Sequence, residues 1–312
     1  MELNKYEIRP FFHGQKAGVQ FLYFILFIIA SGILSSVLAV FLNMVIFGTL
    51  ESSSSLSLYL VNGITTIGTF LLPALLFSYC SERKWFSYSQ SYTLFEKKSG
   101  MIVVVLSLMI LPIIAFLGYI NEQMQLPESL ATLEQWMKLM EEKVGAVLTQ
   151  MLSDRSAWNI ALSLLLMAVF PALCEEYFFR GTLQPLFGNI FKNKHVAIWL
   201  TAFVFSAIHL QFFGFLPRFL LGAYLGYLLL WSGSLWLPIL AHFLHNALTV
   251  IAYYAMGDKA TELEHLSPSD IPGFYPMLSL AVLVTIGGVY LLWKKRKIKH
   301  TDDVDSIAEN NV

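Results

Sequence analysis

Three charged side chains lie close together at the end of an apolar run, in the sequence PALCEEYFFRG at 171–181. Glu175, Glu176 and Arg180 would each cost about 2.5 to 3.5 kcal/mol at the centre of a bilayer unless they have partners or a water-filled cavity. On a helix, Glu176 and Arg180 share a face, whereas Glu175 is turned by about 100°. The arginine can therefore neutralise one carboxylate and leave the other available for chemistry.

Two later apolar segments carry further polar groups with the same helical spacing. FVFSAIHL at 203–210 places Phe205 and His209 four residues apart, and LAHFLHNAL at 240–248 does the same for His242 and Asn246. His245 is turned slightly away from that face. A single histidine in an apolar helix is usually a packed residue, but several polar groups on three segments favour a shared site.

The depth of these groups offers an independent comparison. If the first helix ends near residue 187 and the second begins near 194, Glu175 and His209 lie about 18 and 22 Å from the same membrane surface at 1.5 Å per residue. His242 lies about 12 Å from the turn at 231–234 by the same rise. The sequence predicts one cavity, open toward the cytoplasm, although a buried cluster of structural ion pairs also accounts for the three charges.

The composition requires a membrane for these segments. The chain has 312 residues, of which 56% are hydrophobic and only 13% charged, and its mean hydropathy is +0.63. This is typical of an integral membrane protein, whose first partner is membrane lipid. The net charge of −1 gives no reason to expect a nucleic acid partner. The eight candidate spans lie at about 19–47, 57–80, 101–120, 157–186, 195–213, 216–232, 235–256 and 274–293.

Basic residues are grouped in alternate loops. They precede the first span, recur in the loop before residue 101 and fill the tail KKRKIKH; these groups are Lys5, Arg9 and Lys16, then Arg83, Lys84, Lys97 and Lys98, then 294–300. The positive-inside rule therefore predicts that both termini are cytoplasmic, which eight spans also require. The expected location is therefore a cell membrane.

The expected fold is an all-α polytopic bundle with an amphipathic helix at 129–153 in the third loop. Apolar residues recur there at steps of three and four, opposite a face that carries Glu134, Glu141 and Glu142. Such a helix can lie in the interface as a structural element, or act as a lid or docking helix for substrate. The chain divides into an N-terminal membrane region at 1–156, a core of four spans at 157–256, and an outer loop, last span and basic tail at 257–312.

The three motifs carry a family resemblance. EEYFFR, FSAIH and HFLHN resemble the motifs EExxxR, FxxxH and HxxxN of the CPBP family of membrane proteases. This family includes CAAX proteases such as the Ras-converting CAAX endopeptidase, bacteriocin-processing enzymes and bacterial Abi proteins. The resemblance covers about 157–256. The context RFLLGAYLGYLLLWSGSLWLPILAHFLHN is similar to the bacterial branch, which implies a bacterial cell membrane.

The resemblance implies a role for each matching residue. Glu175 and His209 would activate a water for attack on a peptide carbonyl, and His242 and Asn246 would stabilise the oxyanion. Glu176, Arg180 and Phe205 would organise the site. The cofactor is either absent or one divalent metal, with zinc held by Glu175, His209 and His242 as the plausible set; no HExxH sequence is present.

The function expected from the resemblance is intramembrane hydrolysis of peptide bonds in a peptide or membrane-protein substrate. Peptide or bacteriocin processing, self-immunity and CAAX-type processing all fit this chemistry. A non-catalytic scaffold or immunity protein, or a proton-coupled transporter, would also carry buried Glu and His residues. The oligomeric state does not follow from the sequence.

Overall fold

Long helices make up the regular structure. The computed structural model describes residues 10–51, 54–82, 94–124, 126–257 and 267–309, with side chains as far as Lys295. Within these ranges there is no β-strand. Arg83 and Lys84, used above for the topology, lie outside the described residues.

Seven helices among the described residues are long and apolar enough to cross a membrane. Two of them are divided by π-helical segments, and their parts are given separately. They are α1 (Ala17–Phe47); α2 (Ser55–Thr66) with η1 (Ile67–Leu71) and α3 (Leu72–Glu82); α4 (Lys97–Glu122); α6 (Ala157–Ser163) with η3 (Leu164–Val169), α7 (Phe170–Phe178), η4 (Phe179–Leu183) and α8 (Gln184–Phe191); α10 (Phe215–Ser232); α11 (Trp236–Met256); and α13 (Phe274–Glu309). The predicted all-α polytopic membrane bundle is confirmed.

The fifth predicted span is a short helix, so the number of full-length spans in the described chain is seven rather than eight. Helix α9 (Lys194–Ala207) has 14 residues and is about 21 Å long, less than the roughly 30 Å of a hydrocarbon core. The apolar sequence continues to residue 216, which is why hydropathy overstates the helix.

The turn after α9 extends this segment to the end of the bundle that the short helix does not reach. The side-chain amide of Asn121, in the last turn of α4, donates to the carbonyl of Phe212 at 2.9 Å, and its oxygen accepts from the amide of Leu216 at 2.7 Å. The turn therefore lies at the same end of the bundle as the end of α4. The chain reverses there, as the predicted topology requires.

Each π-helical segment lies just before a proline. A proline cannot donate to the carbonyl four residues earlier and its ring clashes with that carbonyl. For Pro73, Pro171 and Pro185 those carbonyls belong to residues within η1, η3 and η4. At each place the helical turn contains about one more residue than an α-helical turn. The backbone amides of Leu72, Phe170 and Gln184 therefore donate to the carbonyls five residues earlier.

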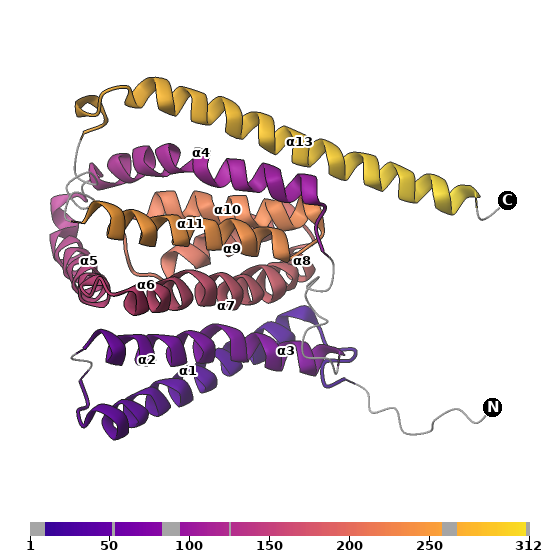
Figure 1. Cartoon of the computed structure of the whole chain (residues 1–312). Helices are drawn as coiled ribbons and strands as arrows, with labels where there is room; N and C mark the ends of the chain where they lie inside the picture. Colours follow the sequence, from indigo (N-terminus) through magenta and orange to yellow (C-terminus); the bar gives the residue numbers. More distant parts are fainter. Residues whose placement is uncertain (1–9, 52–53, 83–93, 125, 258–266, 310–312) are drawn as a thin grey trace.

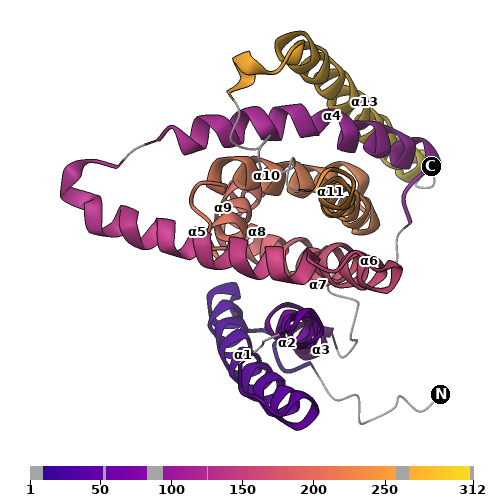
Figure 2. The ribbon, with the colours of Figure 1, turned by 60° about the vertical axis from the view of Figure 1, so that its left-hand side comes forward.

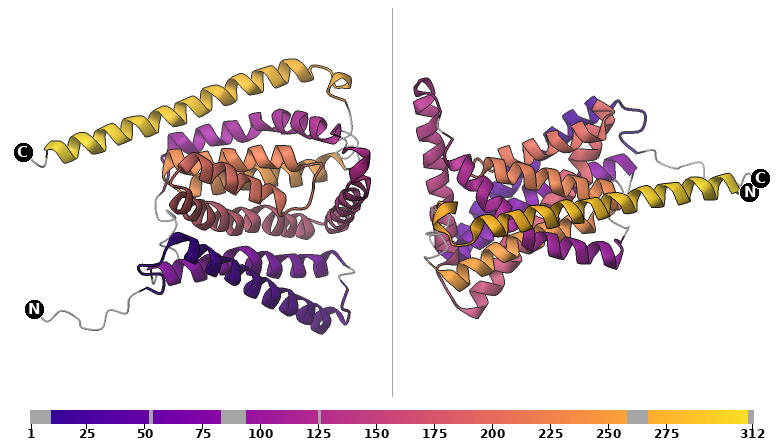
Figure 3. Two further views of the ribbon diagram at one scale, coloured as in Figure 1. Left: turned by 180° about the vertical axis from the view of Figure 1, so that it is seen from behind. Right: turned by 90° about the horizontal axis from the view of Figure 1, so that it is seen from above.

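The helices are arranged on two sides of a central group (Figures 1 and 2). Helices α1 to α3 contact α7 and α8 on one side, whereas α4 and α13 contact α10 and α11 on the other. Figure 3 shows the same arrangement from behind and from above. The predicted boundaries at 156 and 256 fall at the N-cap of α6 and the last residue of α11. Whether they delimit separate units stays a prediction.

Helix α5 (Ala131–Leu152) confirms the amphipathic helix predicted in the third loop. It follows the short η2 (Glu128–Leu130) and lies across the end of the bundle opposite the start of α1 (Figure 2). Most of its apolar residues are exposed, among them Leu133 and Trp136, and only Met151 and Leu152 are buried. The helix is therefore fixed mainly at its C-terminal end.

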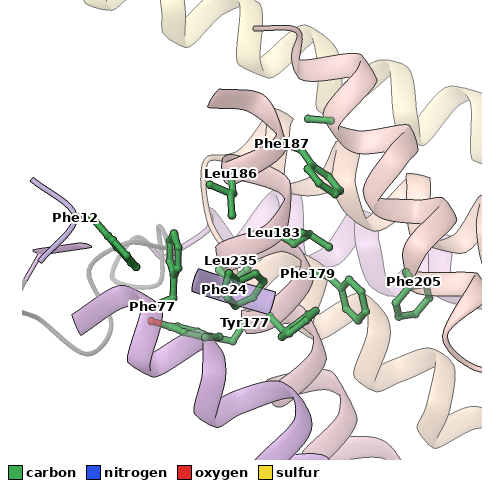
Figure 4. Packing of buried hydrophobic residues seen from close by; sticks show 13 residues of the cluster. Phe12, Phe24, Phe77, Tyr177, Phe179, Leu183, Leu186, Phe187, Phe205 and Leu235 are labelled. Carbon is green, nitrogen blue, oxygen red and sulfur yellow. The ribbon is translucent and has the colours of Figure 1, made fainter. Parts of the chain in front are cut away.

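An apolar cluster fills the end of the bundle at which α1 begins and α8 ends (Figure 4). Phe12 and Phe24 meet Phe77 of α3, and the cluster continues through α8 to Phe205 of α9. Its buried members are Phe12, Phe24, Ala74, Phe77, Tyr177, Phe178, Phe179, Leu183, Leu186, Phe187, Ala197, Phe205 and Leu235. These side chains separate the charged motif from the end that carries the first residues of α1.

A buried polar network joins the first layer to the core at the opposite end. The hydroxyl of Tyr59 donates to the carbonyl of Met151 at 2.7 Å and lies 2.6 Å from the hydroxyl of Ser163. Asn159 and Tyr254 complete the network, with a side-chain amide to hydroxyl distance of 2.9 Å. These hydrogen bonds hold together four helices, α2, α5, α6 and α11. The same polar groups would have no hydrogen-bond partners if they faced lipid.

We expect Tyr59→Phe to lower the free energy of unfolding by about 1 kcal/mol, because a buried carbonyl and hydroxyl lose their shared partner. Unfolding of the purified protein in detergent, followed by circular dichroism, measures this change. Tyr253→Phe is the matched control, since its hydroxyl has no hydrogen-bond partner among the described residues. Equal losses in the two variants would contradict a stabilising role for the network.

Candidate active site

Arg180 and Glu176 form an ion pair inside the bundle. The Nη1 group of Arg180 donates to Oε1 of Glu176 at 2.6 Å, and neither side chain is exposed. Both lie on one face of the helix formed by α7 and η4, as their spacing predicts. The hydroxyl of Thr182 donates to the carbonyl of Tyr177 at 3.2 Å and so satisfies a backbone group beside the π-helical turn.

Two glycines of α10 bring that helix close to this pair. The Nη2 group of Arg180 donates to the carbonyl of Gly222 at 2.9 Å, and the amide of Gln184 donates to the carbonyl of Gly226 at 3.3 Å. A Cβ atom on Gly222 would lie 3.1 Å from the Phe205 ring and 3.2 Å from the backbone of Ala202. Only glycine lets the backbone of α10 approach both α9 and the arginine so closely.

These glycines were missed from the sequence, although a signal was present. The run GAYLG at 222–226 is a small-xxx-small pattern in an apolar span, which is typical of close helix packing. The pattern does not show which neighbour approaches. Its partners here, Arg180 and Gln184, come from another helix and repeat at the same four-residue step.

His242 binds the same carboxylate from the far side. Its Nδ1 lies 2.8 Å from Oε1 of Glu176, which therefore accepts from both the imidazole and Arg180. The second oxygen of Glu176 is buried without a hydrogen-bond partner among the described residues. Glu176 therefore holds the side chains of Arg180 and His242 in place.

Phe205 is the side chain that the three motifs share. Its ring lies 4.7 Å from the guanidinium carbon of Arg180, and the ring centroids of His209 and His242 lie 5.1 and 5.9 Å away in edge-on contacts. A guanidinium against an aromatic face is attracted by the ring quadrupole. The predicted meeting of the motifs is therefore observed around one aromatic residue.

Glu175 has different surroundings from its neighbour. It is buried at 8% exposure, but its Oε2 has no hydrogen-bond partner in the described part of the chain. It lies within electrostatic range of His242, Arg180 and Arg218 without an ion pair to any of them. A buried carboxylate with an unused oxygen can accept a hydrogen bond or a proton from a bound molecule.

His209 lies just beyond the last residue of α9 and is partly exposed. Its Nδ1 is 2.7 Å from the carbonyl of Phe205. Because a carbonyl only accepts, Nδ1 carries the proton, and the neutral ring presents Nε2 as an acceptor. The FxxxH motif thus fixes both the position and the tautomer of the histidine.

The partly exposed members of the site face the α5 end of the bundle. His209, His245 and Asn246 are partly exposed, whereas Glu175 and His242 are buried. Asn246 lies one turn beyond His242 toward the end of α11. The apolar cluster around Phe187 fills the opposite end, where α1 begins, and the predicted opening toward the cytoplasm stays a prediction. The cellular compartment on each side stays a prediction.

A polar chain that the sequence did not predict leads from the site to α5. Arg218 donates to the side-chain oxygen of Gln211 at 2.7 Å and to its carbonyl at 3.3 Å. The amide of Gln211 donates in turn to Glu141 at 3.3 Å, and partial burial raises the pKa of the Glu141 carboxyl. Arg218 also lies within electrostatic range of Glu175, so α5 is linked to the site.

The side chains do not fit the metal set considered from the sequence. In the described ranges, no three residues of the types His, Cys, Asp and Glu are grouped so that they could hold an ion. Glu175, His209 and His242 are therefore not arranged as three ligands of one zinc ion. His242 and His209 each use Nδ1 in a hydrogen bond within the protein, to Glu176 and to the Phe205 carbonyl, and each keeps Nε2 for another partner.

We expect Gly222→Ala to lower the free energy of unfolding by about 1 to 3 kcal/mol, because the added methyl group overpacks the seam between α9 and α10. The midpoint of thermal unfolding in detergent measures the effect. Gly287→Ala in α13 is the control, since a Cβ there meets no atom within 4 Å. If both variants are as stable as the parent, the close approach is unimportant.

Comparison with known proteins places the motifs in one family. Residues 157–248 match the family model described as type II CAAX prenyl endopeptidase Rce1-like. A stretch of 107 residues is 29% identical to the uncharacterized protein YpbD of Bacillus subtilis (strain 168), covering 33% of this chain and 50% of that protein. The chain thus spans about half the length of this relative. No solved structure matches the chain.

The matched region contains Glu175, Glu176, Arg180, His209 and His242, together with the ring contacts of Phe205. The resemblance found in the three motifs is therefore confirmed over most of the region that it covers. Residues 157–248 of this chain are thus similar to the Rce1-like type II CAAX prenyl endopeptidases, the kind of family that the three motifs indicate.

Proposed function

We propose that this chain is an intramembrane endopeptidase in which Glu175 and His209 activate a water molecule. The family implies a membrane-embedded protease in general terms. The assignment of individual roles depends on the local contacts. They favour a glutamate-type mechanism that uses protein side chains alone.

One observation carries the proposal: the two adjacent glutamates have separate environments. Oε1 of Glu176 accepts from Arg180 and His242, so this residue has a structural task. Glu175 forms no ion pair with a described residue, and its buried Oε2 has no hydrogen-bond partner there, as is also true of Oε2 of Glu176. Leaving a buried polar group unsatisfied is costly, and such groups are found where a ligand or reacting molecule completes the bonds.

The first step is attack by water. The Nε2 lone pair of His209 accepts a hydrogen bond that orients the water, and the carboxylate of Glu175 takes its proton. The resulting hydroxide forms a bond to the carbonyl carbon of the scissile peptide, and the carbonyl electron pair moves to oxygen. Glu175 then gives its proton to the leaving nitrogen, the carbon–nitrogen bond breaks, and a carboxylic acid and an amine are released.

The oxyanion of this intermediate needs donors on the opposite side. His242 and Asn246 lie one turn apart on α11, so Nε2 of the imidazolium and the side-chain amide can point to one oxygen. In this form Nδ1 of His242 donates to Glu176 at 2.8 Å. Glu176 thus supports the proton that the oxyanion requires, and Arg180 holds Glu176.

The substrate in this proposal is a peptide or a membrane protein that reaches the site from the α5 side. His209 and Asn246 are the partly exposed members there. Peptide or bacteriocin processing, self-immunity and CAAX-type processing remain compatible uses of the same chemistry. Membrane lipid surrounds the bundle in each of them.

Glu175→Gln should lower the rate of cleavage by about 10² to 10⁴-fold, because the general base is lost. The variant should still fold. The measurement compares protein termini by mass spectrometry in membranes of cells that produce the parent or the variant chain. Peptides that appear only with the parent are candidate products. Identical sets of termini, with equal amounts of folded protein, would rule out a catalytic role for Glu175.

Two variants separate catalysis from structure. Glu176→Gln should lower the stability by about 3 to 5 kcal/mol, because the buried Arg180 loses its counter-charge. Glu142→Gln on the exposed face of α5 should change neither stability nor cleavage. A Glu176→Gln protein as stable as the parent would show instead that the ion pair is not needed for the fold.

Metal removal should leave the activity unchanged, because no ligand set is gathered at the site. The purified protein is treated with EDTA or 1,10-phenanthroline, passed into metal-free buffer and tested on a substrate found by the terminal-peptide comparison. Loss of activity that returns on adding stoichiometric zinc would overturn the glutamate-type mechanism. It would leave the proteolytic function itself in place.

A further inference from the structure

We propose that a groove between the start of α4 and the end of the apolar part of α13 binds one anionic phospholipid from the surrounding membrane. The groove has a volume of about 350 Å³. It is lined by Lys98, Met101, Ile102, Leu291, Lys294 and Lys295. It lies on two helices that contribute nothing to the catalytic residues, so it is independent of the proposed proteolysis.

The apolar part of the groove suits an acyl chain. Helices α4 and α13 meet closely, since a Cβ on Gly288 would lie 2.7 Å from Leu106. Beside this contact Met101 and Leu291 remain 69% and 51% exposed. The packed contact between the two helices forms the bottom of the groove, and the exposed side chains of Met101 and Leu291 form its apolar side.

The charged part of the groove suits a phosphate group. Lys295 is held by Glu96, with 2.8 Å between Nζ and Oε2. Lys98 and Lys294 are exposed and have no carboxylate partner among the described side chains. Three lysines beside one glutamate leave an excess of positive charge, and the two unpaired ammonium groups come from different helices.

The depth of the groove in the membrane indicates that its ligand is a lipid rather than a free ion. Tyr290 and Trp293 are exposed one turn apart on α13, with ring centroids 5.9 Å apart, as in the aromatic belts at membrane interfaces. Lys294 follows directly, at headgroup level. A phosphate bound to the lysines there has its acyl chain beside Leu291, whereas an inorganic ion would leave that wall uncovered.

The test is native mass spectrometry of the full chain, delipidated in detergent and titrated with phosphatidylglycerol or phosphatidylcholine. We expect one phosphatidylglycerol to bind much more tightly than phosphatidylcholine. Each lysine near the membrane surface is worth about fivefold in affinity, so Lys98→Gln with Lys294→Gln should weaken phosphatidylglycerol binding by roughly 25-fold. Both residues are exposed, so folding should be unaffected.

Lys192→Gln with Lys194→Gln is the matched control. These lysines are exposed between α8 and α9, outside the groove, and the double variant removes the same charge. The proposal is overturned if this control weakens binding as much as the groove variant, or if phosphatidylcholine binds equally well. It is also overturned if millimolar inorganic phosphate displaces the lipid, since the lysines alone would then account for binding.

Discussion

The buried charge of Arg180 is the constraint on which the centre of this protein depends. An unpaired guanidinium inside a membrane bundle is costly, so the group needs a counter-charge and acceptors nearby. Both terminal nitrogens of Arg180 have acceptors, whereas Nε has no partner among the described residues. Glu176 supplies the counter-charge, Gly222 supplies a carbonyl, and the Phe205 ring lies over the cation. These partners belong to three different parts of the chain. Satisfying one side chain therefore fixes α7, α9 and α10 relative to one another.

The other features of the core follow from that requirement. Gly222 is needed because any side chain there would hold α10 away from the arginine. The π-helical turn around Arg180 is imposed by Pro185, which removes a helical bond within η4. His242 then uses the carboxylate that Arg180 has already placed. The position of His242 therefore depends on the same carboxylate as the Glu176–Arg180 ion pair.

The sequence predicted what depends on spacing within one helix. The Glu176–Arg180 pair and the amphipathic α5 both follow from the helical repeat. The sequence did not predict features that depend on contacts between distant segments. The apolar turn after Ala207 has the composition of a helix, and the apolar cluster at the end where α1 begins includes Phe12 and Phe77, which lie far from the motifs in sequence. Contacts of this kind leave no local signal.

The distribution of burial separates stability from function within the site. Arg180 and Glu176 are fully buried beside the apolar cluster, where no substrate needs to reach them. His209 and Asn246 lie on the partly exposed α5 side, where the proposed substrate would reach them. Glu175 lies between the two groups, buried enough to be shielded from water yet with one oxygen unused. Helix α5 is buried at Met151 and Leu152 and is joined to the site through Glu141 and Gln211, whereas the ion pair on which the core depends is formed by Glu176 and Arg180.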